Sequence, residues 1–220
     1  MRDAIEYWTV AGVRAVATRM PDAVVRAWGS ALGLMFYVLD RAHRRVALTN
    51  LEQCFPNKPA GVPHPILTIG GVHVENYFAA EDKVAGQIVN RLKQAQQSIH
   101  FLAFSFTHDA IGSAMLARAK AGVSVSGVFE TTGSETQYSE YGRMRKAKLD
   151  VLQDGNPYVM HHKVIIIDGR TVIFGSFNFS NNADKDNDEN LLIVDDPALA
   201  QAFEAEFQRV REVALNPLKK

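Results

Sequence analysis

The chain has 220 residues, of which 47% are hydrophobic and 22% are charged, as in ordinary folded domains. Its formal net charge is zero, with 8 Lys and Arg against 5 Asp and Glu in residues 1–60 and 16 against 19 in the remainder. The larger part is therefore slightly acidic, which excludes the overall basic surface of a strong binder of long nucleic-acid duplexes. A single cysteine excludes an intramolecular disulfide.

Residues 1–58 are predicted to be a helical segment. The longest apolar run, Ala27–Leu39, has 13 residues, fewer than the ~20 that span a bilayer. Arg41, Arg44 and Arg45 follow it, so the segment could lie at a membrane surface with its cations toward anionic head groups. The alternative is a helix packed on the protein with a solvated basic end. Because no secretory pattern is present, we expect a cytoplasmic protein or one attached peripherally to the cytoplasmic face of the inner membrane.

The rest of the chain alternates between strand and helix patterns. Residues 59–65 are predicted to be a linker, because they contain prolines and a glycine, and residues 66–217 to be the main domain. Strands are expected at 66–78, 99–106, 123–129 and 191–194, with 149–152 leading into a hairpin of 160–167 and 171–174. Helices are expected at 81–97, 109–122, 134–148 and 197–213. This alternation predicts an α/β fold.

The predicted helix 134–148 carries Arg143, Arg145 and Lys146 among tyrosines. Basic residues interleaved with aromatic ones could contact the backbone of a phosphate-containing substrate or stack a base. A solvated helical face is the alternative interpretation.

Most of the candidate catalytic and binding residues lie in the stretch 160–190. It contains an H-x-K-x4-D pattern, a Gly-Ser-x-Asn element and a following glutamate: His161, Lys163, Asp168, Ser176, Asn178 and Glu189. In a chain of this composition the first pattern alone should arise roughly 0.02 times by chance. The set is therefore rarely expected by chance and indicates a functional site.

Side chains alternate along a strand, so His161 and Lys163 should share one face while His162 points to the other. Ser176 and Asn178 should share a face if the extended chain continues past Gly175. Together these groups could converge on one small anion. Attack on a phosphodiester needs cations and hydrogen-bond donors around the non-bridging oxygens, together with a nucleophile such as a neutral imidazole.

In this interpretation His161 is the nucleophile, and Lys163 and Asn178 bind the phosphate. Glu189 is the nearest carboxylate that could orient the ring and stabilise its positive charge. This chemistry requires no metal and no cofactor.

The residues HHKVIIIDG, GSFNFS and DNDEN resemble the signature of the phospholipase D superfamily, and in particular its small single-motif branch of endonucleases and cardiolipin hydrolases. The likeness covers roughly 70–217 and implies a mixed sheet flanked by helices. It also implies a nucleophilic His161, phosphate binding by Lys163, Ser176 and Asn178, and support of the histidine by Glu189. The motif's aspartate, Asp168, looks more structural than catalytic in this family.

Only one copy of the motif is present, whereas the superfamily's active site uses two. The resemblance therefore implies a homodimer with a shared site, in which one His161 attacks and that of the other subunit protonates the leaving oxygen.

A second resemblance covers residues 1–58: the stretch DRAHRRVALTNLEQCFPNK, residues 40–58, is similar to the N-terminal segment of the lipid A lauroyl acyltransferase family. That family's catalytic H-x4-D motif is missing, because none of the seven histidines has an aspartate five positions on. The acyltransferase activity is therefore not implied. What remains is an anchoring helical segment or the relic of a gene fusion.

Other polar residues are weaker candidates. The acidic run Asp184, Asp186 and Asp188 resembles a calcium loop, but Glu189 stands where the required glycine would be, so a solvated loop is expected. His108 and Glu130 follow strand ends, where α/β sheets often place ligand groups.

The sequence thus predicts a metal-independent phosphodiesterase with a phosphohistidine intermediate. We expect an endonuclease acting on single-stranded or flexible nucleic acid. The alternatives are a phospholipid hydrolase of phospholipase D type and a non-catalytic fusion or scaffold protein.

Overall fold

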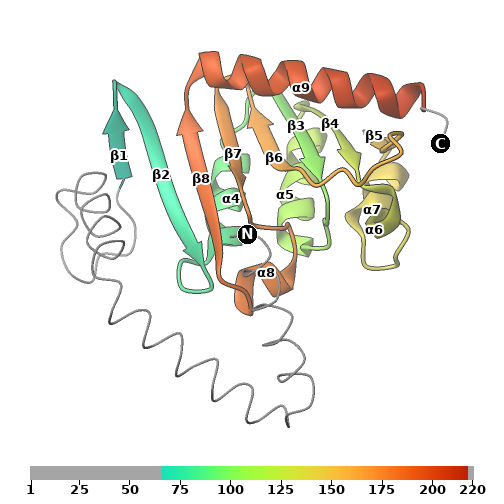
Figure 1. The fold of residues 1–220 in the computed structure, drawn as a ribbon, viewed down its shortest axis with the longest axis horizontal. Coiled ribbons are helices and arrows are strands. Elements are labelled where there is room, and N and C mark those ends of the chain that lie inside the picture. Colours follow the sequence, from blue (N-terminus) through green and yellow to red (C-terminus); the bar gives the residue numbers. More distant parts are fainter. Residues whose placement is uncertain (1–65, 218–220) are drawn as a thin grey trace, which may run out of the picture. The chain divides into compact units, whose positions relative to one another are not determined.

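The structure, a computed structural model, describes residues 66–217. The predicted helical segment 1–58 and linker 59–65 lie outside this range and stay predictions. The described residues form one sheet of 8 strands with helices on both faces (Figure 1). The strands are β1 Ile66–Ile69, β2 Val72–Ala79, β3 Ser98–Ala103, β4 Ser124–Phe129, β5 Asp150–Gln153, β6 Lys163–Ile167, β7 Thr171–Gly175 and β8 Glu189–Asp195. The helices are α4 Val84–Leu92, α5 Asp109–Lys120, α6 Thr131–Ser134, α7 Glu140–Lys146, α8 Asn181–Lys185 and α9 Pro197–Leu215.

The sheet is mixed, with the strand order β1-β2-β8-β7-β6-β3-β4-β5. The neighbours β3, β4 and β5 are parallel and are connected through helices, as parallel strands require. The other neighbouring pairs are antiparallel. The predicted α/β class, with a mixed sheet flanked by helices, is confirmed.

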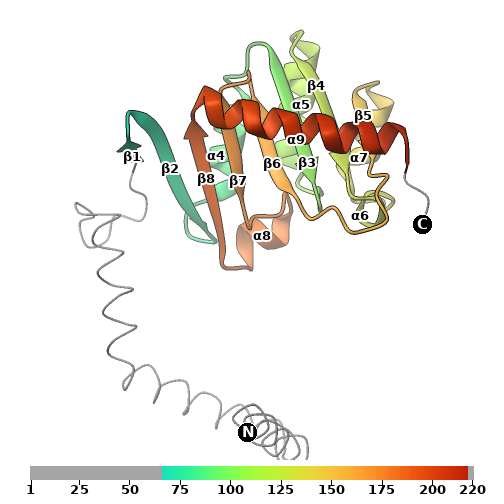
Figure 2. The same cartoon turned by 45° about the horizontal axis from the view of Figure 1, so that its top comes forward.

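Helices cover the two faces of the sheet unequally. α4, α5 and α7 pack on one face, whereas α9 runs across the other (Figures 1 and 2). On β3, Phe101 is buried toward α4 and α5, while Leu102 is buried toward α9 and joins a cluster with Phe207. Because both faces are covered, β3 is almost continuously apolar, as its sequence predicted.

Two predicted helices differ from the structure. The helix expected at 81–97 is only Val84–Leu92, because the backbone N–H groups of residues 96 and 97 bind Asp168 and direct the chain into β3. The helix expected at 134–148 is shorter and starts later: α6 ends at Ser134, and α7 begins after Ser139 and spans Glu140–Lys146. The Ser139 hydroxyl accepts a hydrogen bond from the Tyr141 N–H and so caps a new helix.

One edge of the sheet gathers the segments that carry the candidate site residues. Ala103 at the end of β3 pairs with Lys163 at the start of β6, and Gly175 at the end of β7 pairs with Leu191 near the start of β8. The loops after β3, β4 and β7 therefore meet the segments before β6 and β8 at this edge, the lower one in Figure 1. We call it the site edge. In residues 66–217 no helix is both long and apolar enough to cross a membrane.

Candidate active site

His161 and Lys163 face each other at the site edge. The expected strand 160–167 begins only at Lys163, and His161 lies in the extended segment before it. The Lys163 Nζ lies 3.2 Å from both ring nitrogens of His161 and donates a hydrogen bond to the His161 carbonyl oxygen at 3.0 Å. Lys163 is only 7% exposed, whereas His161 is exposed. A buried cation thus lies against an imidazole that a substrate can reach.

The aromatic ring of Phe104 forms a wall beside this pair. Its centroid lies 4.4 Å from that of the His161 ring and 4.9 Å from the Lys163 Nζ. Phe104 directly follows β3 and was not predicted as a site residue. Its position at the end of a buried strand was the available signal, because α/β sheets place ligand-contacting groups there. The ring shields one side of the ammonium from water.

Ser176 and Glu189 form a hydrogen-bonded pair across β7 and β8. The Ser176 hydroxyl donates to Glu189 Oε2 at 2.5 Å and accepts from the Asn190 N–H at 3.0 Å. Asn187 donates to the other Glu189 oxygen at 3.1 Å. This close approach requires Gly175, since a Cβ there would lie 2.2 Å from the Asn190 carbonyl oxygen.

Glu189 acts on the site through its charge. Burial lowers the pKa of Lys163, and the negative charge of Glu189 partly opposes that shift. The hydrogen bonds of the Glu189 side chain go to Ser176 and Asn187. The expected support of His161 by Glu189 therefore stays a prediction.

Asn178 lies between two fully buried phenylalanines, Phe177 and Phe179. The alternation of burial along 176–179 fits the extended chain expected after Gly175, with Ser176 and Asn178 away from the core. The Asn178 Oδ1 atom is buried and has no hydrogen-bond partner in the described part of the chain. An unpaired acceptor of this kind costs about 1–3 kcal/mol, and the described residues supply no donor for it.

Asp168 lies at the opposite end of β6 from His161. Its carboxylate accepts hydrogen bonds from the backbone N–H groups of Gln96, Gln97 and Ser98 at 2.7–2.9 Å. Asp168 and Gly169 both have positive φ, 53° and 59°, and make the turn into β7. The position of Asp168 is that of a structural residue, which links the hairpin to the start of β3.

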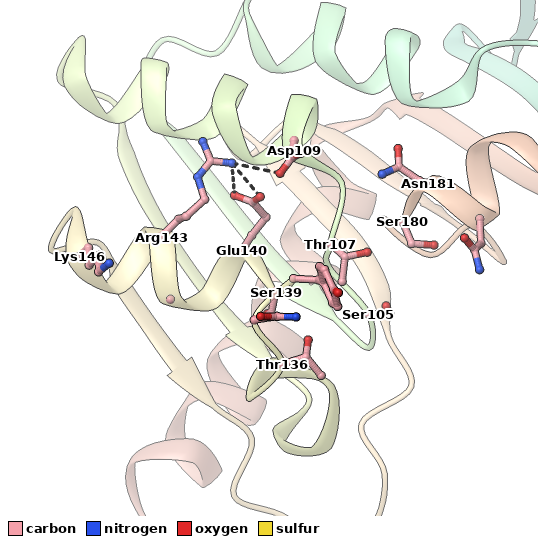
Figure 3. A pocket seen from close by; sticks show the side chains of 14 residues that line it. Ser105, Thr107, Asp109, Thr136, Ser139, Glu140, Arg143, Lys146, Ser180 and Asn181 are labelled. Atoms are coloured by element: carbon pink, nitrogen blue, oxygen red, sulfur yellow. Dashed lines mark hydrogen bonds and ion pairs between the residues drawn. The ribbon is translucent and has the colours of Figure 1, made fainter.

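The three basic residues of the predicted helix 134–148 have different surroundings. Arg143 is bound by Glu140 at 2.8 and 3.0 Å and lies 3.6 Å from Asp109. The Arg145 guanidinium lies 6.0 Å from the centroid of the Tyr141 ring. Lys146 lines a cavity of about 720 Å³ at the site edge (Figure 3). These residues are not a uniform basic face.

Other histidines serve the packing. His162 points away from His161 and contacts Glu206 of α9 at 3.4 Å, as its parity predicted. His108 is buried 3.7 Å from Asp184. Glu130 accepts a hydrogen bond from the Met160 N–H at 2.7 Å, which anchors the residue before His161.

The acidic run 184–188 begins in a short helix. Its first part forms α8, which the sequence did not predict, and the Asp184 carboxylate accepts a hydrogen bond from the Ala85 N–H at 2.9 Å. Within residues 66–217 no group of three or more His, Cys, Asp or Glu side chains is placed to hold a metal ion.

Comparisons with known proteins identify similar sequences and folds. A family profile described as "Cardiolipin synthase, PLD-like domain" matches residues 88–211, and one described as "Bacterial lipid A biosynthesis acyltransferase" matches residues 1–78. A phospholipase D of Rickettsia conorii is 36% identical over 116 residues, which are 53% of this chain and 58% of that protein. The mitochondrial cardiolipin hydrolase of Homo sapiens is 33% identical over 138 residues, 63% of this chain and 54% of that protein. The chain thus spans little more than half the length of these relatives.

Among solved structures, the phospholipase D family member Nuc of Salmonella typhimurium superimposes with a TM-score of 0.59 at 29% identity. The superposition covers 64% of this chain and 95% of Nuc. Almost the whole of that protein therefore corresponds to the described domain.

Proposed function

This chain belongs to the phospholipase D-like domain family, and we propose that it is a metal-independent phosphodiesterase with a phosphohistidine intermediate on His161. The observation that carries the proposal is the contact at 3.2 Å between the buried Lys163 ammonium and the exposed His161 ring. The nucleophile and a cation for the phosphate are thereby held together at one point of the site edge. Ser176 and Asn178 lie at the same edge.

In the proposed reaction, a ring nitrogen of His161 attacks the phosphorus, and the bond from phosphorus to the leaving oxygen breaks. Lys163 and Asn178 bind the non-bridging oxygens, on which negative charge develops. The leaving oxygen takes a proton from His161 of the partner subunit. A water molecule, deprotonated by that same partner histidine, then cleaves the bond between phosphorus and nitrogen and restores the free enzyme.

The proposal includes a homodimer with a site on its two-fold axis. The chain carries one copy of the H-x-K-x4-D motif, and the proposed reaction needs one nucleophile and one acid. An isologous interface would bring two copies of the same site edge together.

We propose nucleic acid, single-stranded or flexible, as the substrate of this site. Support comes from the likeness of the described domain to Nuc over almost all of that protein's length. The site edge also offers a polar cavity, which suits a sugar and phosphate chain. Because residues 61–220 carry 16 basic against 19 acidic side chains, the contacts to a polyanion must be local.

Phospholipid hydrolysis is the second candidate, and one observation favours it. Tyr158 and Val159, just before the segment that contains His161, are 82% and 63% exposed. An exposed aromatic and aliphatic tip beside the site could enter a lipid surface, where tyrosine is favoured at the interface. Residues 1–58 would then hold the enzyme peripherally at the cytoplasmic face of the inner membrane.

The test is hydrolysis of bis(p-nitrophenyl) phosphate, single-stranded DNA and cardiolipin vesicles in excess EDTA. Wild type, His161→Ala and the matched control His162→Ala would be compared. We expect EDTA-resistant activity that His161→Ala abolishes and His162→Ala retains, with DNA the preferred substrate. Preference for cardiolipin would select the phospholipase. No activity on any of the three from a folded dimer would overturn the enzymatic proposal in favour of a non-catalytic fusion or scaffold.

A further inference from the structure

The cavity at the site edge lies between α5, α7 and the start of α8 (Figure 3). We call it the α5–α7 cavity. Ser105, on its wall, directly follows Phe104, whose ring contacts His161, and Ser180 comes two residues after Asn178. The Phe179 N–H donates to the Ser105 carbonyl oxygen at 3.1 Å, which ties these two walls together. The cavity is therefore lined by residues of the same two segments that carry Phe104 and Asn178.

Hydroxyl and amide groups dominate the wall of the α5–α7 cavity. They include Ser105, Thr107, Thr136, Ser139, Ser180 and Asn181. No aliphatic side chain is among the residues that line it. An acyl chain would find no aliphatic side chain to pack against here, and apolar burial is its main source of affinity. A sugar, with several hydroxyl groups, would find both donors and acceptors there.

The charged groups of the wall differ in their availability. Arg143 is held by both oxygens of Glu140 and by Asp109, as the dashed lines in Figure 3 show. Burial raises the pKa of Glu140, and the Arg143 guanidinium lowers it again in part. Lys146 is exposed, and its side chain makes no hydrogen bond or ion pair with any residue of the described range. Its ammonium is the cation of this wall that is free for a ligand.

We propose that the α5–α7 cavity binds the nucleotide next to the scissile phosphate of a single-stranded nucleic acid. Its sugar contacts the hydroxyl-lined wall, and its phosphate binds Lys146. Tyr138, which lines the cavity and is 72% exposed, offers a ring on which the base stacks. This inference rests on the proposed phosphodiesterase activity and adds to it the residues that read the substrate beyond the phosphate under attack.

The structure separates Lys146 from the basic neighbours that the sequence grouped with it. Arg143 orders the wall through its ion pairs, and Arg145 does not line the cavity. Lys146→Ala should therefore weaken nucleic-acid recognition, while Arg145→Ala on the same helix serves as the charge-matched control. Lys146→Arg keeps the positive charge and should retain most of the wild-type nucleic-acid recognition.

The first measurement is kcat/KM for an eight-residue oligothymidylate divided by kcat/KM for bis(p-nitrophenyl) phosphate, which has no second nucleotide. Loss of one contact to a charged group should lower this ratio about tenfold in Lys146→Ala. Arg145→Ala should keep the wild-type ratio. In a plot of log KM for the oligonucleotide against log salt concentration, the slope should also be smaller by about 0.7 in Lys146→Ala than in wild type.

The second measurement does not depend on turnover. Binding of fluorescent oligothymidylate to His161→Ala is compared with binding to the double variant that adds Lys146→Ala, and we expect the Kd to rise about tenfold. Equal Kd values would overturn the cavity assignment. If Lys146→Ala lowers kcat/KM for cardiolipin vesicles but not for the oligonucleotide, each relative to bis(p-nitrophenyl) phosphate, the assignment would be overturned in favour of a lipid. If wild type cleaves none of these substrates, the proposed chemistry fails, while the binding comparison still decides the cavity.

Discussion

The interpretation of Asp168 can be tested by replacing it with asparagine. Its carboxylate accepts three backbone N–H groups, and hydrogen bonds to charged acceptors contribute about 1.5–3 kcal/mol each, against about 1 for neutral ones. Asparagine tolerates the positive φ of this position and keeps one acceptor oxygen. Since the carboxylate is partly exposed, water weakens the loss, and we expect Asp168→Asn to lower the free energy of unfolding by about 2 kcal/mol.

In a domain of this size that loss corresponds to a fall in Tm of roughly 4–8 °C. Asp168→Ala should lower the free energy of unfolding by about 1 kcal/mol more, because alanine is strained at positive φ. The control is Asp186→Asn, an exposed aspartate whose side chain makes no hydrogen bond or ion pair within the described residues. Turnover of bis(p-nitrophenyl) phosphate per folded molecule should persist in Asp168→Asn. An unchanged Tm with abolished turnover would refute the structural role.

The same replacement predicts a pH dependence. Burial raises the pKa of Asp168, but the N–H groups of Ser98, Gln96 and Gln97 outweigh it and hold the pKa below its usual value of 3.8. A carboxyl whose pKa is lowered by folding stabilises the protein above its unfolded pKa and loses that contribution as the pH falls through its folded pKa. The difference in unfolding free energy between wild type and Asp168→Asn should be full at pH 7 and should shrink below pH 3.8.

Three further variants probe the site and its supports. Removal of the Glu189 charge should lower the pKa of Lys163 further, so the alkaline limb of the pH–rate profile should move to lower pH in Glu189→Gln; an unmoved limb would contradict the coupling. Gly112→Ala places a Cβ 2.0 Å from the Glu140 carboxylate and should lower stability by about 1–3 kcal/mol, as measured by thermal unfolding. Gly175→Ala meets a backbone oxygen at 2.2 Å and should cause a similar loss together with reduced kcat; wild-type values of both would exclude the tight strand contact.

Local patterns in the sequence predicted the parts of the site that local rules control. The β-branched run before Asp168 gave β6, and the parity of strand positions separated His161 from His162. Likewise, the spacing of Ser176 and Asn178 predicted their shared direction away from the core. These features depend on neighbours within two or three residues, so a single sequence contains them.

Features that depend on distant segments could not be predicted in this way. Phe104 meets His161 only because β3 and β6 pair antiparallel in one register, and the order of the strands cannot be read from their hydrophobicity. The break before α7 follows from a cap at Ser139, which a wider helical pattern concealed. The binding of Arg143 by Glu140 and Asp109 required the packing of α5 against α7.

The surroundings of His161 lead to a last prediction, on how subunits share the reaction. Two carboxylates of this region have other partners: Glu189 accepts from Ser176, and Glu206 binds Arg209 of its own helix and His162. The proposed mechanism takes its acid from a second copy. If subunits exchange, an equal mixture of wild type and His161→Ala should have about one quarter of the activity of wild type at the same total protein concentration. Only dimers with two intact histidines turn over. Independent sites would leave about one half, and that result, measured with bis(p-nitrophenyl) phosphate, would refute the shared site.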